Sequence, residues 1–226
     1  MRDHSNPSKD LTHGRHHFLM ISLFVCGGVL LGGSAFASDE MGMHEHMSEH
    51  EHHHHAMNTE AAVKRSEVDY KVPALNLIRQ DGTTAVFPKE IDDGRPVILN
   101  FIYTSCTAVC PLTSQVFSRV QKELNEGHMK VHMLSISIDP EYDTPQRLDA
   151  YARKYQASAQ WQFYTGTIET SVAMQKAFNA YRGDKMNHIP LTFLRAAPGK
   201  PWVRLDGFAN PDEVVHEFHK MTGSES

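Results

Sequence analysis

Short apolar runs separated by turn residues fill the second half of the chain, and their pattern predicts an α/β fold. Runs over residues 97–103 and 131–138 are rich in β-branched and aromatic residues, as in strands buried on both faces. Shorter runs predict further strands over residues 75–79, 83–87, 161–165, 191–194 and 202–205. Because Gln80-Asp81-Gly82 is a turn signal between the first two of these, we expect an N-terminal β-hairpin there.

Stretches with apolar residues at helical spacing lie between or after the strands. The first follows Pro111, and three more begin at the capping residues Thr144, Thr167 and Asn210. The expected buried faces are Leu112, Val116, Phe117, Val120 and Leu124; Leu148, Tyr151, Ala152 and Tyr155; Ile168, Val172, Ala173 and Ala177; and Val214, Phe218 and Met221. Strands that alternate with helices predict a central mixed β-sheet with helices on both faces.

Residues 1–37 have the pattern of a targeting segment. Basic residues near the start precede the apolar run 18–37, which ends in Ala35-Phe36-Ala37. This pattern is typical of a secretory signal peptide cleaved after Ala37. An uncleaved membrane anchor is the alternative, because the run approaches the roughly 20 residues that span a bilayer. In both cases the rest of the chain is expected in the periplasm or at the outer face of the inner membrane, and Cys26 is removed or lies in the membrane.

Residues 38–58 form a low-complexity segment in which histidine and methionine are interleaved. This composition cannot build a core, so we expect a disordered tether. Imidazole suits copper, nickel and zinc, whereas thioethers select Cu(I), so the segment is suited to collecting copper in either oxidation state. The candidate ligands are His44, His46, His50, His52, His53, His54, His55, Met41, Met43, Met47 and Met57.

Residues 59–226 have the composition of one globular domain, and they are numerous enough for a sizeable core. The whole chain has 226 residues and a net charge of -5. It therefore lacks the basic footprint of a nucleic-acid-binding protein.

The strongest chemical signal is the pair Cys106 and Cys110, between the strand 97–103 and the helix that follows. Three residues separate them, so the two sulfurs could close a disulfide or bind one metal ion together. Two ordinary buried cysteines are the alternative. Because Cys110 is expected near a helix N-terminus, where the helix dipole favours the thiolate, its pKa is expected to be lowered.

A histidine and an aspartate are expected at the same edge of the sheet, since ligands of such sheets bind at the carboxyl ends of the strands. His188 precedes the strand 191–194, and Asp139 ends the strand 131–138. Two sulfurs and one imidazole make a soft site that suits Cu(I) and can hold Cu(II), but it is one ligand short of structural zinc. Asp139 could orient His188 or a metal-bound group, or it could merely start a turn, and Asp143 is expected to be an ordinary loop residue.

Four motifs in order resemble those of the Sco/SenC family of thioredoxin-like copper-binding proteins: NFIYTSCTAVCP, SISIDPEYDTP, WQFYTG and NHIPLTFL. The resemblance covers about residues 72–218. It implies a thioredoxin-like fold with a hairpin insertion, a copper ion bound by Cys106, Cys110 and His188, and a part in assembling the dinuclear copper centre of cytochrome c oxidase. The implied partners are a cuproprotein acceptor such as cytochrome c oxidase subunit II, and a periplasmic thiol reductant or another copper chaperone.

Two positions depart from the family pattern. Thr107-Ala108-Val109 stand where many relatives carry proline and aspartate, and loss of that carboxylate should ease ionisation of the thiols and change their redox potential. Pro190 directly after His188 is unlike many members, and it is similar to the proline, often cis, that faces the cysteines of thioredoxins.

Two functions follow from these patterns. The first is a metallochaperone, not an enzyme, that carries one Cu(I) or Cu(II) ion and passes it to a cuproprotein by ligand exchange. The second is a thiol-disulfide oxidoreductase in which Cys106 and Cys110 cycle between dithiol and disulfide. A peroxidase is a weaker alternative, because no arginine lies near the cysteine motif to activate a peroxidatic cysteine.

Overall fold

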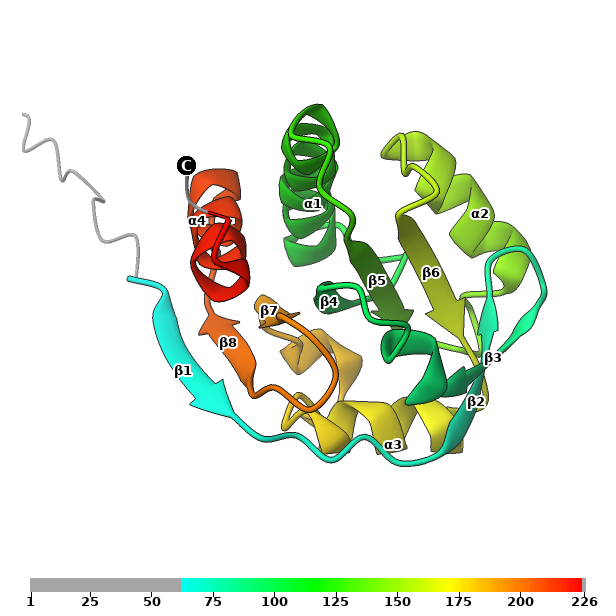
Figure 1. Cartoon of the computed structure of the whole chain (residues 1–226). Helices are drawn as coiled ribbons and strands as arrows, with labels where there is room; N and C mark the ends of the chain where they lie inside the picture. The colour runs from blue at the N-terminus through cyan, green and yellow to red at the C-terminus, as the bar shows by residue number, and fades with distance from the viewer. Residues whose placement is uncertain (1–61, 225–226) are drawn as a thin grey trace, which may run out of the picture. The chain divides into compact units, whose positions relative to one another are not determined.

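A mixed eight-stranded sheet organises residues 62–224, which are the residues that the structure, a computed structural model, describes (Figure 1). The strands are β1 (Lys64–Val68), β2 (Leu75–Arg79), β3 (Thr84–Phe87), β4 (Val97–Ile102), β5 (His132–Ser137), β6 (Trp161–Thr165), β7 (Leu191–Arg195) and β8 (Trp202–Asp206). The helices are α1 (Val109–Glu126), α2 (Pro145–Lys154), α3 (Ile168–Ala177) and α4 (Pro211–Thr222), with short 3-10 turns η1 (Lys89–Ile91) and η2 (Lys185–Asn187). The predicted signal segment and the histidine and methionine ligands of residues 38–58 lie outside the described residues.

The strand order is β1-β8-β7-β4-β5-β6-β2-β3. β4, β5 and β6 are parallel to one another, whereas β7 runs antiparallel to β4 and β8 antiparallel to β7. β2 and β3 form the predicted antiparallel hairpin, which joins the sheet through β6. The predicted mixed sheet is therefore confirmed.

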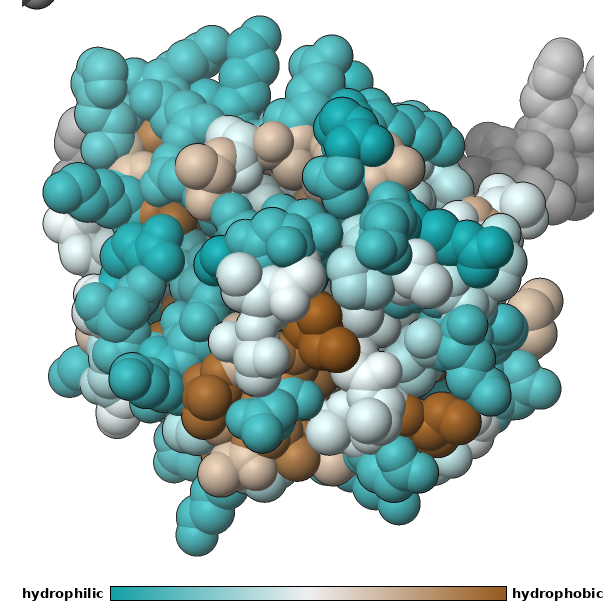
Figure 2. Space-filling view, turned by 90° about the vertical axis from the view of Figure 1, so that its right-hand side faces the viewer, coloured by the Kyte–Doolittle hydropathy of each residue, from teal (hydrophilic) through white to brown (hydrophobic). Residues whose placement is uncertain are grey.

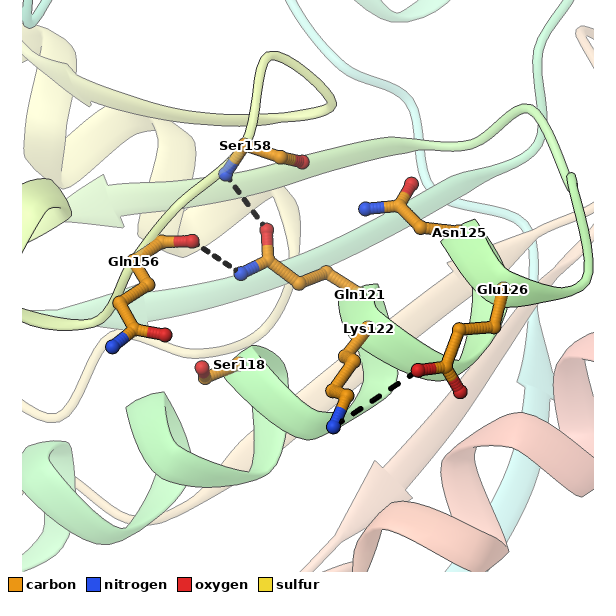
Figure 3. Close-up of a pocket in the computed structure, with 7 residues that line it drawn as sticks. All are labelled: Ser118, Gln121, Lys122, Asn125, Glu126, Gln156 and Ser158. Carbon is orange, nitrogen blue, oxygen red and sulfur yellow. Dashed lines mark hydrogen bonds and ion pairs between the residues drawn. The ribbon is translucent and has the colours of Figure 1, made fainter.

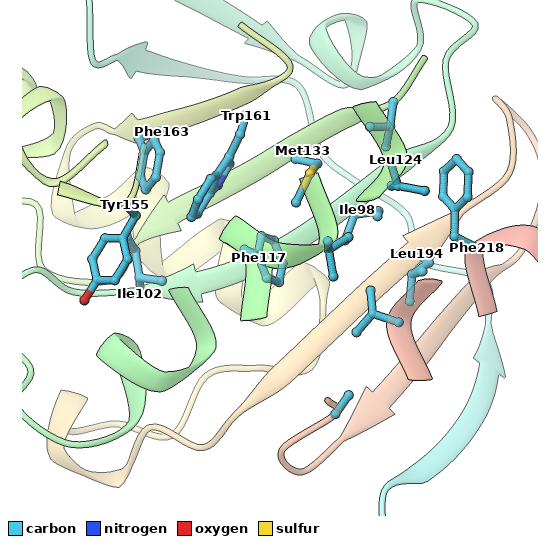
Figure 4. Packing of buried hydrophobic residues seen from close by; sticks show 14 of the residues in the cluster. Ile98, Ile102, Phe117, Leu124, Met133, Tyr155, Trp161, Phe163, Leu194 and Phe218 are labelled. Atoms are coloured by element: carbon cyan, nitrogen blue, oxygen red, sulfur yellow. The ribbon is translucent and has the colours of Figure 1, made fainter. Parts of the chain in front are cut away.

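Alternate residues of β4 enter two separate cores, one on each face of the sheet. Ile98 and Ile102 belong to a cluster that α1, α2 and α4 cover, with Phe117 and Trp161 near its centre (Figure 4). Because this burial follows the two-residue period of a strand, both faces of the central strands are apolar.

The second cluster lies on the opposite face. It holds Leu99 and Phe101 of β4 together with Met174 of α3 and Phe178 directly after that helix. Phe178 packs edge to face on Phe101, Phe193 and Trp202, with ring centroids 5.9, 5.1 and 5.0 Å apart. Helices therefore cover both faces, as the sequence predicts. The named members of both clusters lie between residues 63 and 221, so this part of the chain carries a complete core of its own.

Two helices differ from the sequence prediction. In α3 the buried residues are Ser171, Met174 and Gln175, and Ile168 is 48% exposed, so the predicted apolar face is wrong for this helix. Hydrogen bonds explain this, since the Ser171 hydroxyl donates to the Ser137 carbonyl oxygen at 2.9 Å and is therefore satisfied when buried. The helix α1 begins two residues before the expected Pro111, and Leu112 is 52% exposed rather than buried.

β1 was not predicted from the sequence. Its residues KRSEV are mostly polar, and the strand forms because its backbone pairs with β8 from Lys64↔Asp206 to Val68↔Trp202. The Arg65 guanidinium also donates to Glu217 of α4 at 2.8 Å. A strand held at a sheet edge by backbone pairing leaves no apolar pattern to detect.

The outer surface is mainly polar. Figure 2 shows the face on the side of α2 and the β2–β3 hairpin, where small hydrophobic areas are separated by hydrophilic residues. Ile78 and Val86 of the hairpin are among the exposed apolar side chains. Of the helices in residues 62–224, none is both long and apolar enough to cross a membrane.

Candidate metal centre

Strand topology brings three segments to one edge of the sheet. β4 and β5 are parallel and end at Ile102 and Ser137, so the loops that follow them leave the sheet side by side. β7 is antiparallel to β4, with Thr192 opposite Asn100, so the residues before β7 arrive at the same edge. The cysteine loop, the Asp139 loop and the His188 segment therefore meet there, as the sequence predicts.

Cys106 and Cys110 lie next to each other at the start of α1. The backbone N–H of Cys110 donates to the Cys106 sulfur at 3.5 Å, and the backbone N–H of Tyr103 donates to the Cys110 sulfur at 3.5 Å. Ala108 at the N-cap position supplies no side-chain cap, so the Cys106 sulfur accepts a helix N–H that would otherwise lack a partner. Both thiols are free; Cys106 is half-buried and Cys110 is fully buried.

The pKa values of the two thiols are shifted in opposite directions. Burial raises the pKa of Cys110 to about 12. Burial also acts to raise the pKa of Cys106, but hydrogen bonds from the backbone of Cys110 and Ala108 and from the Tyr103 side chain outweigh it, and that pKa is lowered. The prediction that Cys110 is the acidic thiol is wrong, because the helix N–H groups stabilise the Cys106 thiolate while Cys110 is enclosed by apolar side chains.

His188 lies at the end of β4 with its Nε2 atom 2.9 Å from the Phe101 carbonyl oxygen. A carbonyl oxygen only accepts, so Nε2 carries the proton and the lone pair is on Nδ1. Burial lowers the pKa of His188, which keeps the ring neutral near pH 7. Ligand histidines commonly donate their second ring N–H to a carbonyl in this way, so Nδ1 is prepared to bind a metal.

The third candidate ligand is near the cysteines but does not yet complete a site. The His188 ring packs edge to face on Tyr103 at 6.4 Å between centroids, and the Tyr103 side chain is near enough to Cys106 to help lower the pKa of that thiol. In residues 62–224, no group of three or more histidine, cysteine, aspartate or glutamate side chains is placed to hold a metal ion. The donor set suits soft copper, but the histidine must move toward the two sulfurs to join them.

Asp139 contacts a lysine rather than the histidine. Its Oδ2 accepts from the Lys185 ammonium at 2.5 Å, and its backbone N–H donates to the Ser137 hydroxyl at 3.0 Å. His188 Nε2 is bound to a carbonyl oxygen, as described above, so the structure does not place Asp139 on His188. The carboxylate instead ties the segment before β7 to the end of β5.

Asp143 has a structural part that sequence reasoning missed. It is fully buried, and its carboxylate accepts from the Ser137 hydroxyl at 2.6 Å and from the backbone N–H and hydroxyl of Thr104 at 3.1 and 2.5 Å. Burial raises its pKa. Asp143 is therefore not an ordinary loop residue, because it fastens the cysteine loop to the end of β5. The motif Asp-Thr-Pro looks like a helix start, and nothing in it indicates this long-range contact.

The expected likeness of Pro190 to a cis proline is not met, since within residues 62–224 the cis peptide is Phe87-Pro88 and Ile189-Pro190 is trans.

A pocket of about 360 Å³ lies along the second half of α1, away from the cysteines (Figure 3). Its polar lining includes Gln121, whose side-chain amide donates to the Gln156 carbonyl at 2.7 Å and accepts from the Ser158 N–H at 2.8 Å, so this amide is already paired within the protein.

A mixed sheet with helices on both faces and a cysteine pair at a strand-to-helix turn defines a thioredoxin-like protein. The SCO1/SenC family matches residues 64–223, so the chain belongs to the SCO1/SenC family. It is 29% identical to the SCO1 protein homolog of Bacillus subtilis (strain 168), covering 68% of this chain and 83% of that relative.

Solved structures agree with this assignment. BsSco, a member of the Sco family of cytochrome c oxidase assembly proteins in which a disulfide switch was identified, is 25% identical with a TM-score of 0.60, covering 71% of this chain and 98% of BsSco. Yeast Sco1 with copper bound is 18% identical with a TM-score of 0.60, covering 70% of this chain and 96% of that one. The predicted fold class and family are therefore confirmed.

Proposed function

We propose that this chain is an exported metallochaperone that binds one copper ion through Cys106, Cys110 and His188. The ion is cargo, which the chain passes by ligand exchange to a cuproprotein acceptor such as cytochrome c oxidase subunit II. Membership of a family that includes a protein solved with copper bound supports the choice of metal. The description of BsSco as a cytochrome c oxidase assembly protein supports the choice of acceptor.

The observation that carries the proposal is the state of His188. Its Nε2 proton is committed to the Phe101 carbonyl oxygen, so Nδ1 is free to bind a metal at the same sheet edge as the two adjacent sulfurs. Thiolates prefer Cu(I), and imidazole binds copper in both oxidation states, so the three donors together suit a copper ion in either state.

Copper binding on this arrangement has a natural order. The two cysteines already lie next to each other at the start of α1, so they bind first and release their thiol protons. His188 binds last, by moving about its contact with Phe101. The residues before it, from Tyr181 to Asn187, are exposed, which leaves the segment room to move. A ligand that arrives last is also the first to leave, which suits transfer to an acceptor.

A thiol-disulfide oxidoreductase is the second candidate, and the unequal thiols favour it. Cys106 is the more accessible and more acidic thiol, as an attacking nucleophile should be, and buried Cys110 is placed to resolve a mixed disulfide. In this reaction the Cys106 thiolate attacks a disulfide of the partner and Cys110 then displaces the partner's second thiol. The partner gains two thiols and this chain keeps the disulfide, which a periplasmic dithiol reductant must reduce again.

The experiment is an anaerobic competition titration of Cu(I) against a chromophoric chelator, with the reduced domain, residues 59–226. This part contains the complete core described above and lacks the histidine and methionine segment, which would bind copper itself. Wild type is compared with His188→Ala, and with His216→Ala as the matched control on the exposed side of α4.

We expect one tight equivalent in wild type and in His216→Ala, and a large loss of affinity in His188→Ala. Weak binding that does not depend on His188 would contradict the chaperone proposal. In the same samples, disulfide reduction that survives His188→Ala but needs Cys106 would favour the oxidoreductase, and the redox potential of the cysteine pair would then be the quantity to measure.

A further inference from the structure

Met186 lies beside the candidate metal centre with its sulfur turned toward it. The residue is in η2, two positions before His188, and its side chain is 73% exposed. Despite this exposure, its Sδ atom is 3.8 Å from the Tyr103 hydroxyl oxygen. A large apolar side chain in water therefore has one specific polar contact, and that contact points to the cysteine loop.

Tyr103 connects Met186 to every candidate copper ligand. Its side chain lies close enough to Cys106 to lower the pKa of that thiol, its ring packs on His188, and its backbone N–H donates to the Cys110 sulfur. The Met186 sulfur therefore contacts the same tyrosine side chain that neighbours Cys106. Met186 is the outermost member of this group, since Cys106 is half-buried and Cys110 is fully buried.

The thioether has the right chemistry for this position. A methionine sulfur is a soft ligand that selects Cu(I), and it carries no proton that must be lost first. The unbranched side chain has three rotatable bonds, so the sulfur can turn from Tyr103 to an ion held by Cys106. The nearby Lys185 ammonium is paired with the Asp139 carboxylate, which offsets its repulsion of a cation.

We propose that Met186 is an additional Cu(I) ligand at the mouth of the site, bound to the ion together with Cys106. This rests on the proposed copper site, and it goes beyond the ligand set of two cysteines and one histidine. Met186 binds through a sulfur lone pair and remains on the ion beside the two cysteines and His188. No electron is transferred in these steps, and the protons released come from the cysteines.

The test follows the methionine methyl groups by NMR in the reduced domain, residues 59–226, labelled at the methionine ε-methyl carbon. Met186→Leu assigns the Met186 signal and removes the sulfur while keeping an apolar side chain of similar size. Met129→Leu is the matched control, because Met129 follows the far end of α1, whose last residue, Glu126, is about 24 Å along the helix axis from Cys110. Cu(I) is diamagnetic, so a bound thioether gives a shifted signal.

We expect the Met186 signal to shift with the first equivalent of Cu(I) while the Met129 signal stays in place. Met186→Leu should weaken Cu(I) binding in the chelator competition by about tenfold, at the low end of the effects of residues around a metal site. Cu(II) binding should not change, because the thioether selects Cu(I). Met129→Leu should match wild type in both oxidation states.

Three results would overturn the inference. Tight Cu(I) binding that needs Cys106 and Cys110, with an unmoved Met186 signal and unchanged affinity in Met186→Leu, would sink the role of Met186 and leave the proposed function standing. Equal losses in Met186→Leu and Met129→Leu would mean a general effect of losing a methionine. Absence of tight Cu(I) binding in wild type would remove both proposals together.

Discussion

At the scale of single residues, the two cysteines differ because one accepts helix N–H groups and the other is enclosed. Cys106 is half-buried with a lowered pKa, and Cys110 is fully buried with a raised one. Their order along the chain does not predict this, because the helix begins at Val109 and its first free N–H groups point back to Cys106.

Cys106 should therefore react first with alkylating reagents. In the reduced, metal-free domain at pH 7.5, we expect iodoacetamide to modify Cys106 at least about tenfold faster than Cys110, because burial denies access to the second thiol. Peptide mass spectrometry at successive times measures both rates. In Cys106→Ser the remaining thiol should stay slow, and rapid labelling of Cys110 there would contradict the described burial.

A buried histidine far from the cysteines should make stability depend on pH. His132 at the start of β5 is 3% exposed and contacts the Tyr164 hydroxyl at 3.3 Å. Burial and the charge of Arg95 lower its pKa against the opposing effects of Glu90 and Asp93. Below about pH 6.5 the unfolded chain binds a proton at this site before the folded chain does, so folding stability falls as the pH decreases.

In His132→Gln we expect a flatter dependence of the unfolding free energy on pH between 7 and 5. The difference in slope from wild type should be at most about 1.4 kcal/mol per pH unit, the limit for one proton. Urea unfolding at each pH measures it, and His128→Gln, at an exposed histidine, should keep the wild-type slope. Parallel profiles for His132→Gln and wild type would mean that the folded protein accepts the proton as readily as the unfolded chain.

Only part of the candidate site is visible in the sequence. Cys106, Cys110 and His188 stand out because their residue types and the strand pattern indicate one sheet edge. Asp143 and Met186 do not, since each gains its part from a contact with a residue distant in sequence, Thr104 for one and Tyr103 for the other. The spacing of residues along the chain does not indicate such contacts between distant segments.

At the scale of elements, strands were predicted more securely than helix faces. β4 and β5 are short, mostly apolar runs rich in β-branched residues, which is typical of strands buried on both faces. In α3, by contrast, Ser171 and Gln175 face inward and hydrogen-bond each other, while Ile168 is exposed. Apolar periodicity fails where buried polar groups are satisfied by hydrogen bonds. It also misses β1, because backbone pairing with β8 and the Arg65–Glu217 contact hold that strand rather than an apolar face.

The corrected face of α3 predicts unequal effects of two substitutions. Met174→Ala removes a fully buried side chain and should lower the unfolding free energy by about 2–5 kcal/mol. Ile168→Ala, at the exposed first residue of the same helix, should change it by less than about 0.5 kcal/mol. Chemical denaturation measures both variants. Equal losses of unfolding free energy in the two variants would mean that Ile168 is as buried as Met174, as the apolar pattern predicts.

At the scale of the whole molecule, the order of strands and helices was enough to predict the fold class, since parallel strands with intervening helices allow few arrangements. The direction of β7 also brought His188 to the cysteine edge, as expected. Topology does not predict the distance between His188 and the sulfurs. It determines which edge of the sheet a segment reaches, whereas local hydrogen bonds determine the positions of the side chains there.

The histidine and methionine segment should matter only when copper is scarce. Deleting residues 41–57 from the exported chain should slow loading of Cys106 and Cys110 at limiting copper, because a tethered ligand raises the local concentration of the ion. Protection of the two thiols from alkylation measures occupancy of the site, which should reach the wild-type level at excess copper. A segment of equal length with Gln for His and Leu for Met is the matched control. Loading as fast as wild type with that control would make the segment a linker only.

The contacts that place His188 and Cys110 both end on main-chain atoms at the end of β4, one within the strand at Phe101 and one just after it at Tyr103. His188 donates to the Phe101 carbonyl oxygen, and Cys110 accepts from the Tyr103 N–H. A main-chain carbonyl and amide are present whichever side chains occupy positions 101 and 103. The relative positions of these two candidate ligands therefore depend on the path of the main chain and not on which side chains occupy positions 101 and 103. Substitutions at those two positions that keep β4 in place should leave both contacts intact.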